Sequence, residues 1–279
     1  MLGSDLAPLW DQQMKLSLFP HSMCDVTDRT QVNRIISDEN PDIVILLAAA
    51  TDVDRCQTDH EYAFHTNSIG AEIVAQACSK AGAGLVFVSS IAVFSGEKDS
   101  PYNEYDVPDP CNVYGMSKLH GENAVRTFCP THWIVRTGWL FGGGVRDMKF
   151  VARILRKIAL DQEIKVVRDC VGSPTYTADL ASGILKLVNS FQYGTYHLVN
   201  HGVPASRYEL ARETMIIAGH SPELITPCFS SDIHLPAPRP KMEAAESIKL
   251  TSHTNLLRLP DWRESLSRYI KGTLKELIK

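Results

Sequence analysis

The stretch that decides the fold is residues 84–118, GLVFVSSIAVFSGEKDSPYNEYDVPDPCNVYGMSK. An apolar run at 85–88 ends in two hydroxyl side chains, Ser89 and Ser90. Such a run is typical of a parallel strand that is buried on both faces and reaches the edge of its sheet. The Pro-, Asp- and Asn-rich residues 97–110 predict a surface loop between this strand and the next element.

Tyr114 and Lys118 follow this loop in a segment that we expect to be helical over 114–128. Residues four apart share one face of a helix, so the two side chains can reach the same space. A nearby ammonium should lower the pKa of a phenol, which can then give a proton to a carbonyl oxygen that Ser90 holds in place. The alternative is an exposed tyrosine and a solvated lysine, and the strand with its serines upstream favours the proton-donor interpretation.

Composition excludes several classes of partner. The chain has 279 residues, of which 44% are hydrophobic and 22% charged, so we expect a packed core rather than disorder. The formal net charge is −4 and the basic residues form no run, which argues against nucleic acid as a partner. The sequence contains no apolar stretch of about 18 residues, so we expect no membrane span, and we see no signal peptide.

The seven cysteines are scattered and never stand in Cys-x-x-Cys spacing. This pattern argues for reduced thiols in a cytoplasmic protein and against a disulfide framework or a zinc site. We accordingly predict no metal ligands.

The pattern along the chain is that of an α/β protein. Residues 42–50, DIVILLAAA, form a nearly continuous apolar run that ends in three alanines, and residues 61–81 have helical spacing. Strands alternating with helices predict a doubly wound parallel sheet. Further strands are expected at 15–19, 133–136, 164–167 and 195–199, and further helices at 31–36, 149–159, 178–190, 208–218 and 261–278.

The chain opens at Met1 with a helix-like stretch rather than with a strand. A Rossmann fold normally begins with a buried strand and a glycine-rich turn that cradles a pyrophosphate. We therefore expect that the first strand and first glycines are missing from this sequence, that Gly3 is the last glycine of the motif, and that the chain as given binds its cofactor poorly. The alternative is an ordinary start with one loop glycine.

Taken together, the motifs resemble those of the extended short-chain dehydrogenase/reductases, and most closely the dTDP-4-dehydrorhamnose reductases. The resemblance covers nearly the whole chain. The matching segments are residues 25–28, 48–54, 88–90, 93–94, 112–115, 117–118, 121–122, 136–139, 171–175, 178–180, 194–198, 239–240 and 259–262.

The resemblance implies a Rossmann-type domain at 1–140 and 176–204, with a smaller substrate-binding part at 141–175 and 205–279. It implies NADPH-dependent reduction of the 4-keto group of a nucleotide-activated 6-deoxyhexulose, in the synthesis of dTDP-L-rhamnose, with NADH left open as the cofactor. A nucleotide sugar is then the small-molecule partner, and a homodimer is left open.

The resemblance also assigns roles to individual residues. It implies catalytic roles for Ser90, Tyr114 and Lys118. Cofactor contacts are expected at Gly3, Asp25, Val26, Ala48, Ala49, Ala50, Tyr114 and Lys118, and substrate contacts at Val53, Ser90, Trp139 and Arg239. The absence of an acidic residue before Asp25, with His21 in a position where a basic residue often meets a 2′-phosphate, favours NADP.

Three departures from the family pattern bear on the substrate. Ser90-Ile91-Ala92 replaces the usual Thr-Asp-Tyr, which leaves the exact hexulose open and argues against a dehydratase. Lys149 replaces an Asn, and Glu243 replaces a Ser. These departures keep a second interpretation open, namely a non-catalytic binding subunit on the same fold, like the regulatory beta subunit of methionine adenosyltransferase.

Overall fold

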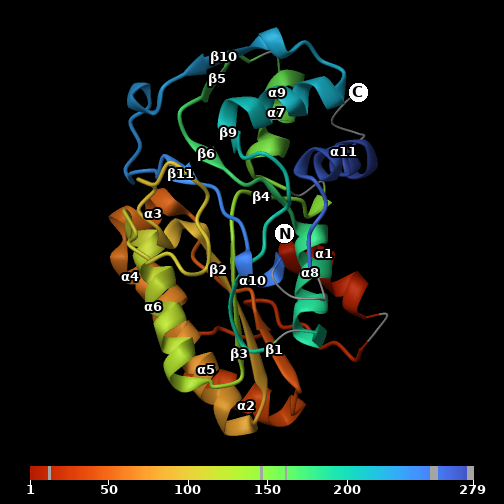
Figure 1. The fold of residues 1–279 in the computed structure, drawn as a ribbon. Coiled ribbons are helices and arrows are strands. Elements are labelled where there is room, and N and C mark those ends of the chain that lie inside the picture. The colour runs from red at the N-terminus through yellow and green to blue at the C-terminus, as the bar shows by residue number, and fades with distance from the viewer. Residues whose placement is uncertain (12–13, 145–146, 161, 191, 252–256, 275–279) are drawn as a thin grey trace.

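The computed structural model describes residues 1–11, 14–144, 147–160, 162–190, 192–251 and 257–274. Figure 1 shows the lower half of the molecule built around a sheet with helices on both faces, and the upper half built from shorter strands and further helices.

The main sheet is parallel and has four strands in the order β1–β2–β3–β8. Its strands are β1 (Ile43–Leu46), β2 (Gly84–Ser90), β3 (His132–Thr137) and β8 (Gly194–His197). In this register Ser90 at the end of β2 lies beside Thr137 at the end of β3. The carboxyl ends of the strands therefore meet at one edge, where parallel α/β sheets bind their ligands.

Helices cover both faces of the sheet, as the alternating pattern predicted (Figure 1). On one face α2, α5 and α6 pack on Leu46, Leu85, Phe87 and Ile134. On the other face α1 and α8 pack on Val86, Trp133 and Val135. The bounds of these helices are α1 (Leu2–Trp10), α2 (Arg29–Glu39), α5 (Gly70–Ala81), α6 (Val113–Phe128) and α8 (Thr177–Ser190). The doubly wound Rossmann-type prediction is confirmed.

Two predicted elements differ from the structure. Residues 15–19 form no strand, because no described strand pairs with them, and Leu18 and Phe19 are 58% and 37% exposed. The helix predicted over 61–81 is divided into α4 (His60–Phe64), a π-helical turn η1 (His65–Ile69) and α5. Single π-helical turns often mark functional sites, and this one carries the buried Asn67.

The upper half holds the shorter strands. Strands β5 and β10 form a parallel pair, β11–β6–β9 form a three-stranded sheet, and β4 pairs with β7. Helices α7, α9 and α11 pack around an aromatic core that includes Phe141, Trp262 and Tyr269. The bounds are β4 (Leu140–Phe141), β5 (Ile164–Val167), β6 (Val171–Gly172), β7 (Thr175–Tyr176), β9 (Ala205–Ser206), β10 (Ile225–Cys228), β11 (Met242–Glu243), α7 (Phe150–Ala159), α9 (Arg207–Ala218) and α11 (Trp262–Thr273).

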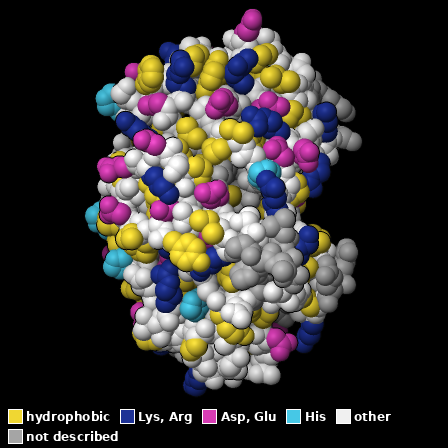
Figure 2. Space-filling view, in the orientation of Figure 1, with side chains coloured by type: hydrophobic (Ala, Val, Ile, Leu, Met, Phe, Trp, Pro, Cys, Tyr) yellow, Lys and Arg dark blue, Asp and Glu magenta, His cyan; other side chains and the backbone are white. Residues whose placement is uncertain are grey.

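Short helices complete the connections: α3 (Val53–Thr58), η2 (Ile91–Val93), η4 (Pro222–Leu224), η5 (Ser230–Asp232) and α10 (Ile248–Thr251). On the face drawn in Figure 2, acidic and basic side chains are interspersed. Within the described ranges, no helix is both long and apolar enough to cross a bilayer.

Candidate active site

The site is built where β2 ends and α6 begins. Asn112 caps α6 by accepting a hydrogen bond from the Gly115 N–H at 2.9 Å. A Cβ at Gly115 would lie 2.1 Å from the Ala92 carbonyl oxygen, so only glycine lets this helix approach the turn after β2 so closely. The close approach brings Tyr114, in the first turn of α6, into hydrogen-bonding contact with the Ser90 side chain.

The protonation of Tyr114 differs from the expectation. Burial raises the pKa of Tyr114 to about 12, and its hydrogen bond to Ser90 only partly opposes this shift. Glu243 raises the pKa further. The net lowering expected from Lys118 is therefore wrong, because burial dominates the environment of the phenol. Tyr114 is therefore protonated at neutral pH, as a proton donor must be.

Lys118 lies one helical turn beyond Tyr114 and is 2% exposed. Its Nζ donates a hydrogen bond to the Val88 carbonyl oxygen at 2.9 Å and lies 4.2 Å from the centre of the Phe87 ring. Burial lowers the pKa of Lys118 to about 8, against the opposing pull of Glu122. An ammonium has three N–H donors, so the bond to Val88 leaves two for a ligand.

Asn67 fixes the end of β1 to this helix. Its side chain accepts from the Ala50 N–H at 2.9 Å and donates to the Ala50 carbonyl oxygen at 3.0 Å and to Ser117 Oγ at 2.9 Å. Sequence reasoning assigned Asn67 no role. Its only signal in the sequence was its position among smaller neighbours on the predicted 61–81 helix.

A second polar network lies beneath the site. Ser89 Oγ donates to Glu122 Oε1 at 2.6 Å, and Arg136 donates to both oxygens of that carboxylate at 2.8 and 2.7 Å. Glu122 is fully buried and Arg136 is 2% exposed. The pair ties α6 to β2 and β3 directly behind Ser90. Sequence reasoning did not single out this network, because an acid and an arginine 14 residues apart have no recognisable spacing.

The residues expected to hold a cofactor line the same edge. Ala48 is exposed, Ala49 half-buried and Ala50 buried. The backbone after β1 is therefore accessible at Ala48 and held by the Asn67 hydrogen bonds at Ala50. Gly3 lies in the first turn of α1, where a Cβ would be 3.4 Å from a methyl group of Leu47. Small residues at a strand end let a ligand approach the backbone.

One buried polar atom at this edge has no protein partner among the described residues. Thr137 Oγ1, beside Ser90 in the sheet, is buried and makes no hydrogen bond. Buried hydroxyls normally find a partner. An orphaned hydroxyl at the ligand-binding edge, beside Ser90 in the sheet, fits a polar nucleotide cofactor.

The other two predicted cofactor residues are placed before α2. Hydrogen bonds from the Thr27 N–H and hydroxyl to the Asp25 carboxylate lower its pKa, and His21 lowers it further. Val26 packs so closely on the start of α5 that a Cβ at Gly70 would lie 2.9 Å from it. His21 thus lies close enough to Asp25 to act on its charge, and His21 itself is exposed.

Two of the predicted substrate residues, Arg239 and Val53, lie together at α3. Arg239 donates to Asp54 Oδ2 at 2.9 Å and to the Ala237 carbonyl oxygen at 2.8 Å. This ion pair docks the proline-rich loop on α3, where Val53 is half-buried. Ile91, beside Ser90, is 1% exposed, so it packs in the core rather than facing a substrate.

Trp139 is held in an unusual conformation. Its φ is +46°, in the left-handed region that non-glycine residues seldom adopt. Its indole N–H donates to Glu243 Oε2 at 2.8 Å, and the Arg207 guanidinium lies 3.6 Å from the ring centre. A Cβ at Gly172 would lie 2.3 Å from the ring. The indole is thus wedged between Arg207 and Gly172, and Trp139 is only 8% exposed.

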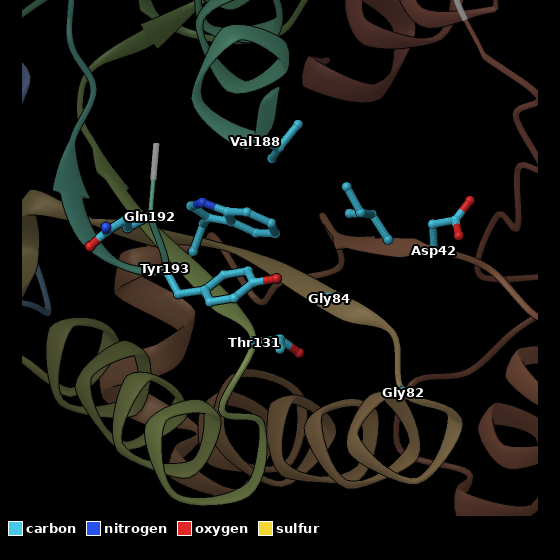
Figure 3. A pocket seen from close by; sticks show the side chains of 9 residues that line it. Asp42, Gly82, Gly84, Thr131, Val188, Gln192 and Tyr193 are labelled. Carbon is cyan, nitrogen blue, oxygen red and sulfur yellow. The ribbon is translucent and has the colours of Figure 1, made fainter. Parts of the chain in front are cut away.

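A sizeable cavity lies away from this site. It measures about 580 Å³ and is lined by Asp42, Ile43, Gly82, Gly84, Thr131, Trp133, Val188, Gln192 and Tyr193. Figure 3 shows these residues around the amino ends of the strands, with Val188 approaching from α8. A second cavity of about 350 Å³ lies between α6 and the 104–108 loop. Neither cavity includes Ser90, Tyr114 or Lys118, and ligands of parallel sheets bind at the carboxyl ends. We therefore place the candidate site at the Ser90 edge.

Comparisons with known proteins agree with this architecture. Residues 1–274 match the model of the family described as RmlD substrate binding domain. The chain is 41% identical over 247 residues to a dTDP-4-dehydrorhamnose reductase of Mycolicibacterium smegmatis, covering 88% of this chain and 74% of that protein.

Solved structures give the same result. A dTDP-4-dehydrorhamnose reductase of Clostridium acetobutylicum superposes with a TM-score of 0.91 at 34% identity, covering 97% of this chain and 95% of that one. The Bacillus anthracis dTDP-4-dehydrorhamnose reductase in complex with NADP superposes with a TM-score of 0.90 at 33% identity, covering 97% of each chain.

Proposed function

The chain belongs to the dTDP-4-dehydrorhamnose reductase family of extended short-chain dehydrogenase/reductases, and from this premise we propose that it uses NADPH to reduce the 4-keto group of a dTDP-activated 6-deoxyhexulose. The product is then the corresponding 4-hydroxy sugar nucleotide, dTDP-L-rhamnose. The observation that carries the proposal is the contact between Tyr114 and Ser90 at the edge of the sheet, with Lys118 one turn further along the same helix.

Tyr114 is the proposed proton donor. As the carbonyl carbon is reduced, negative charge develops on its oxygen, and the neutral phenol of Tyr114 transfers its proton there. The raised pKa does not prevent this transfer, because an alkoxide is a much stronger base than a phenolate. Ser90 donates a hydrogen bond to the same oxygen and keeps it in reach of Tyr114.

NADPH, when bound, supplies the hydride. Ala48, Ala49 and Ala50 are the proposed backbone contacts for it, together with Gly3, Asp25 and Val26. Lys118 would donate to its polar groups with the two N–H groups that Val88 leaves free. His21, which lies near Asp25, supports NADP rather than NAD as the cofactor.

We propose that two parts of the chain bind the two ligands. Residues 1–140 and 176–204, which include the main sheet and its flanking helices, would bind the cofactor. Residues 141–175 and 205–279 would bind the nucleotide sugar, together with Val53 and Trp139. The position of Glu243 in the second part, close enough to Tyr114 in the first to raise its pKa, supports this division.

The non-catalytic alternative is not favoured. Several of the similar proteins are named as reductases, and the hydroxyl, phenol and ammonium groups needed for reduction all lie near the end of β2 and the start of α6.

The direct test is NADPH oxidation by the purified chain, followed by absorbance, with the dTDP-activated 4-keto-6-deoxyhexulose as substrate. We expect substrate-dependent oxidation and a product whose mass is higher by two hydrogens. NADPH oxidation that does not depend on the sugar nucleotide would contradict the proposal.

A further inference from the structure

We propose that Arg207 binds the diphosphate of the nucleotide-sugar substrate. This inference deepens the function proposed above and rests on it. It assigns a ligand to a cation that the sequence analysis did not identify, at the first residue of α9.

The first observation is that aromatic rings, rather than a hydrogen bond or an ion pair among the described residues, hold the Arg207 guanidinium in position. Its guanidinium lies 3.6 Å from the centre of the Trp139 ring and 5.2 Å from that of Phe150. Among the described residues, however, its side chain makes no hydrogen bond and no ion pair. The aromatic rings thus fix the plane of the guanidinium while its five N–H donors stay available.

The second observation is the charge around it. Burial disfavours the Arg207 charge and lowers its pKa to about 10, and Arg239 lies close enough to lower it further. Glu243 attracts Arg207 and opposes this shift, but its Oε2 accepts a hydrogen bond from the Trp139 indole, and among the described residues no hydrogen bond joins Glu243 to the Arg207 side chain. Two guanidinium groups gathered in a half-buried site are stabilised when an anion binds between them.

The third observation concerns Arg239, which family resemblance assigned to the nucleotide sugar. Arg239 already donates to Asp54 and to the Ala237 carbonyl oxygen. Part of its donor set therefore holds the loop on α3. Arg207 has the larger free donor set, and a planar guanidinium matches phosphate oxygens with two parallel hydrogen bonds.

The location is appropriate for a diphosphate. Arg207 touches Trp139, Trp139 donates to Glu243, and Glu243 acts on the pKa of Tyr114. A sugar with its 4-keto oxygen at Tyr114 would therefore have its diphosphate on the Trp139 side, within the part of the chain that carries Arg207 and Arg239.

The experiment measures binding by calorimetry, with dTDP and thymidine as the two probes, for the wild-type chain and for Arg207→Gln. We expect Arg207→Gln to weaken dTDP binding at least about tenfold, and to leave thymidine binding unchanged, because thymidine has no phosphate. The dTDP affinity of Arg207→Lys should lie between those of the wild type and Arg207→Gln, since lysine keeps the charge but lacks the planar set of N–H donors of the guanidinium. Arg212→Gln, an exposed arginine on the same helix, is the matched control and should bind both probes like the wild type.

Equal dTDP affinity in Arg207→Gln and wild type would overturn the proposal. So would an equal loss of dTDP and thymidine binding, which would mean that Arg207 acts only by supporting Trp139. A wild-type chain that binds dTDP no better than thymidine would overturn it as well.

The two proposals can fail separately. Loss of dTDP binding in Arg207→Gln, with no NADPH oxidation by the wild type, would retain the diphosphate site and reject the reductase. Turnover by Arg207→Gln with an unchanged KM for the sugar nucleotide would retain the reductase and reject the diphosphate site.

Discussion

Lys118 donates a hydrogen bond from its buried ammonium to the carbonyl oxygen of Val88 at 2.9 Å, so the helix that carries Tyr114 is tied to the strand that carries Ser90. The same burial lowers the pKa of Lys118 to about 8. Lys118 is therefore cationic below about pH 8 and neutral above it, whereas Tyr114, with a pKa of about 12, stays protonated throughout.

This predicts a pH dependence with a defined sign. The value of kcat/KM for NADPH, which reports the free enzyme, should fall as the pH rises through about 8, because Lys118 loses the charge with which it binds the cofactor. Lys80→Arg, at the exposed end of α5, should give the wild-type profile. A profile that stays flat through this range would show that Lys118 does not titrate there.

The Glu122–Arg136 pair should dominate the stability of the site. Replacing Glu122 with Gln leaves the buried Arg136 cation without a counter-ion, and we expect a loss of about 3–5 kcal/mol in the free energy of unfolding. Urea unfolding measures this loss. Glu163→Gln removes one partner of an exposed pair, with side chains 66% and 63% exposed, and should cost less than about 1 kcal/mol.

The same pair gives a stability change with acid. Burial alone raises the pKa of Glu122, but the hydrogen bonds and charge of Arg136 outweigh burial and hold the pKa below its ordinary value. The contribution of Glu122 is therefore fully present above its unfolded pKa and is lost as the pH falls through the folded one. The free energy of unfolding of Glu122→Gln, measured with urea at a series of pH values, should therefore fall less steeply with acid than that of the wild type. An equally steep fall would assign the acid sensitivity to other carboxyl groups.

Asn67 should matter for cofactor binding. Asn67→Ala removes both bonds to Ala50 and the bond to Ser117, which frees the backbone after β1. Each unsatisfied buried group costs about 1–3 kcal/mol, so we expect lower stability together with a higher KM for NADPH. The exposed Asn123→Ala on α6 is the control. A variant that is less stable but keeps its KM for NADPH would limit Asn67 to a structural role.

Gly172 should control the position of the sugar-side tryptophan. A methyl group at Gly172 would lie 2.3 Å from the Trp139 ring, so Gly172→Ala must displace the indole, at a cost typical of overpacking, about 1–3 kcal/mol. We expect a higher KM for the sugar nucleotide and little change in KM for NADPH. Gly272→Ala, where a methyl group meets open space, should be neutral. Equal effects on both KM values would contradict a substrate-side role for Trp139.

The sequence predicted the parts of the fold that have a strong local signal. The alternation of apolar strands and amphipathic helices gave the parallel sheet, and the helix expected from Tyr114 to Phe128 begins one residue earlier, at Val113. The strand predicted over residues 15–19 is wrong. Such a pattern forms a strand only where a partner strand is available, and no described strand pairs with these residues. Residues 275–278 of the predicted terminal helix lie outside the described residues.

The candidate site was predictable where spacing carries information and not where it depends on long-range packing. Tyr114 and Lys118 share a helix face, and their four-residue spacing shows it. The direction of the Tyr114 pKa shift depends on burial by elements distant in sequence, so it could not be read from that spacing. Arg207 and Glu243 meet Trp139 from separate strands and helices, and no local pattern joins them.

The central claim is that Tyr114 gives the proton to the 4-keto oxygen. It is tested most directly by the single-turnover rate of NADPH oxidation by Tyr114→Phe, with NADPH affinity measured alongside and the exposed Tyr105→Phe as control. We predict a rate about 10²–10⁴-fold below that of the wild type, with unchanged NADPH affinity and a Tyr105→Phe rate equal to the wild-type rate. A Tyr114→Phe rate within about twofold of the wild type would contradict the account.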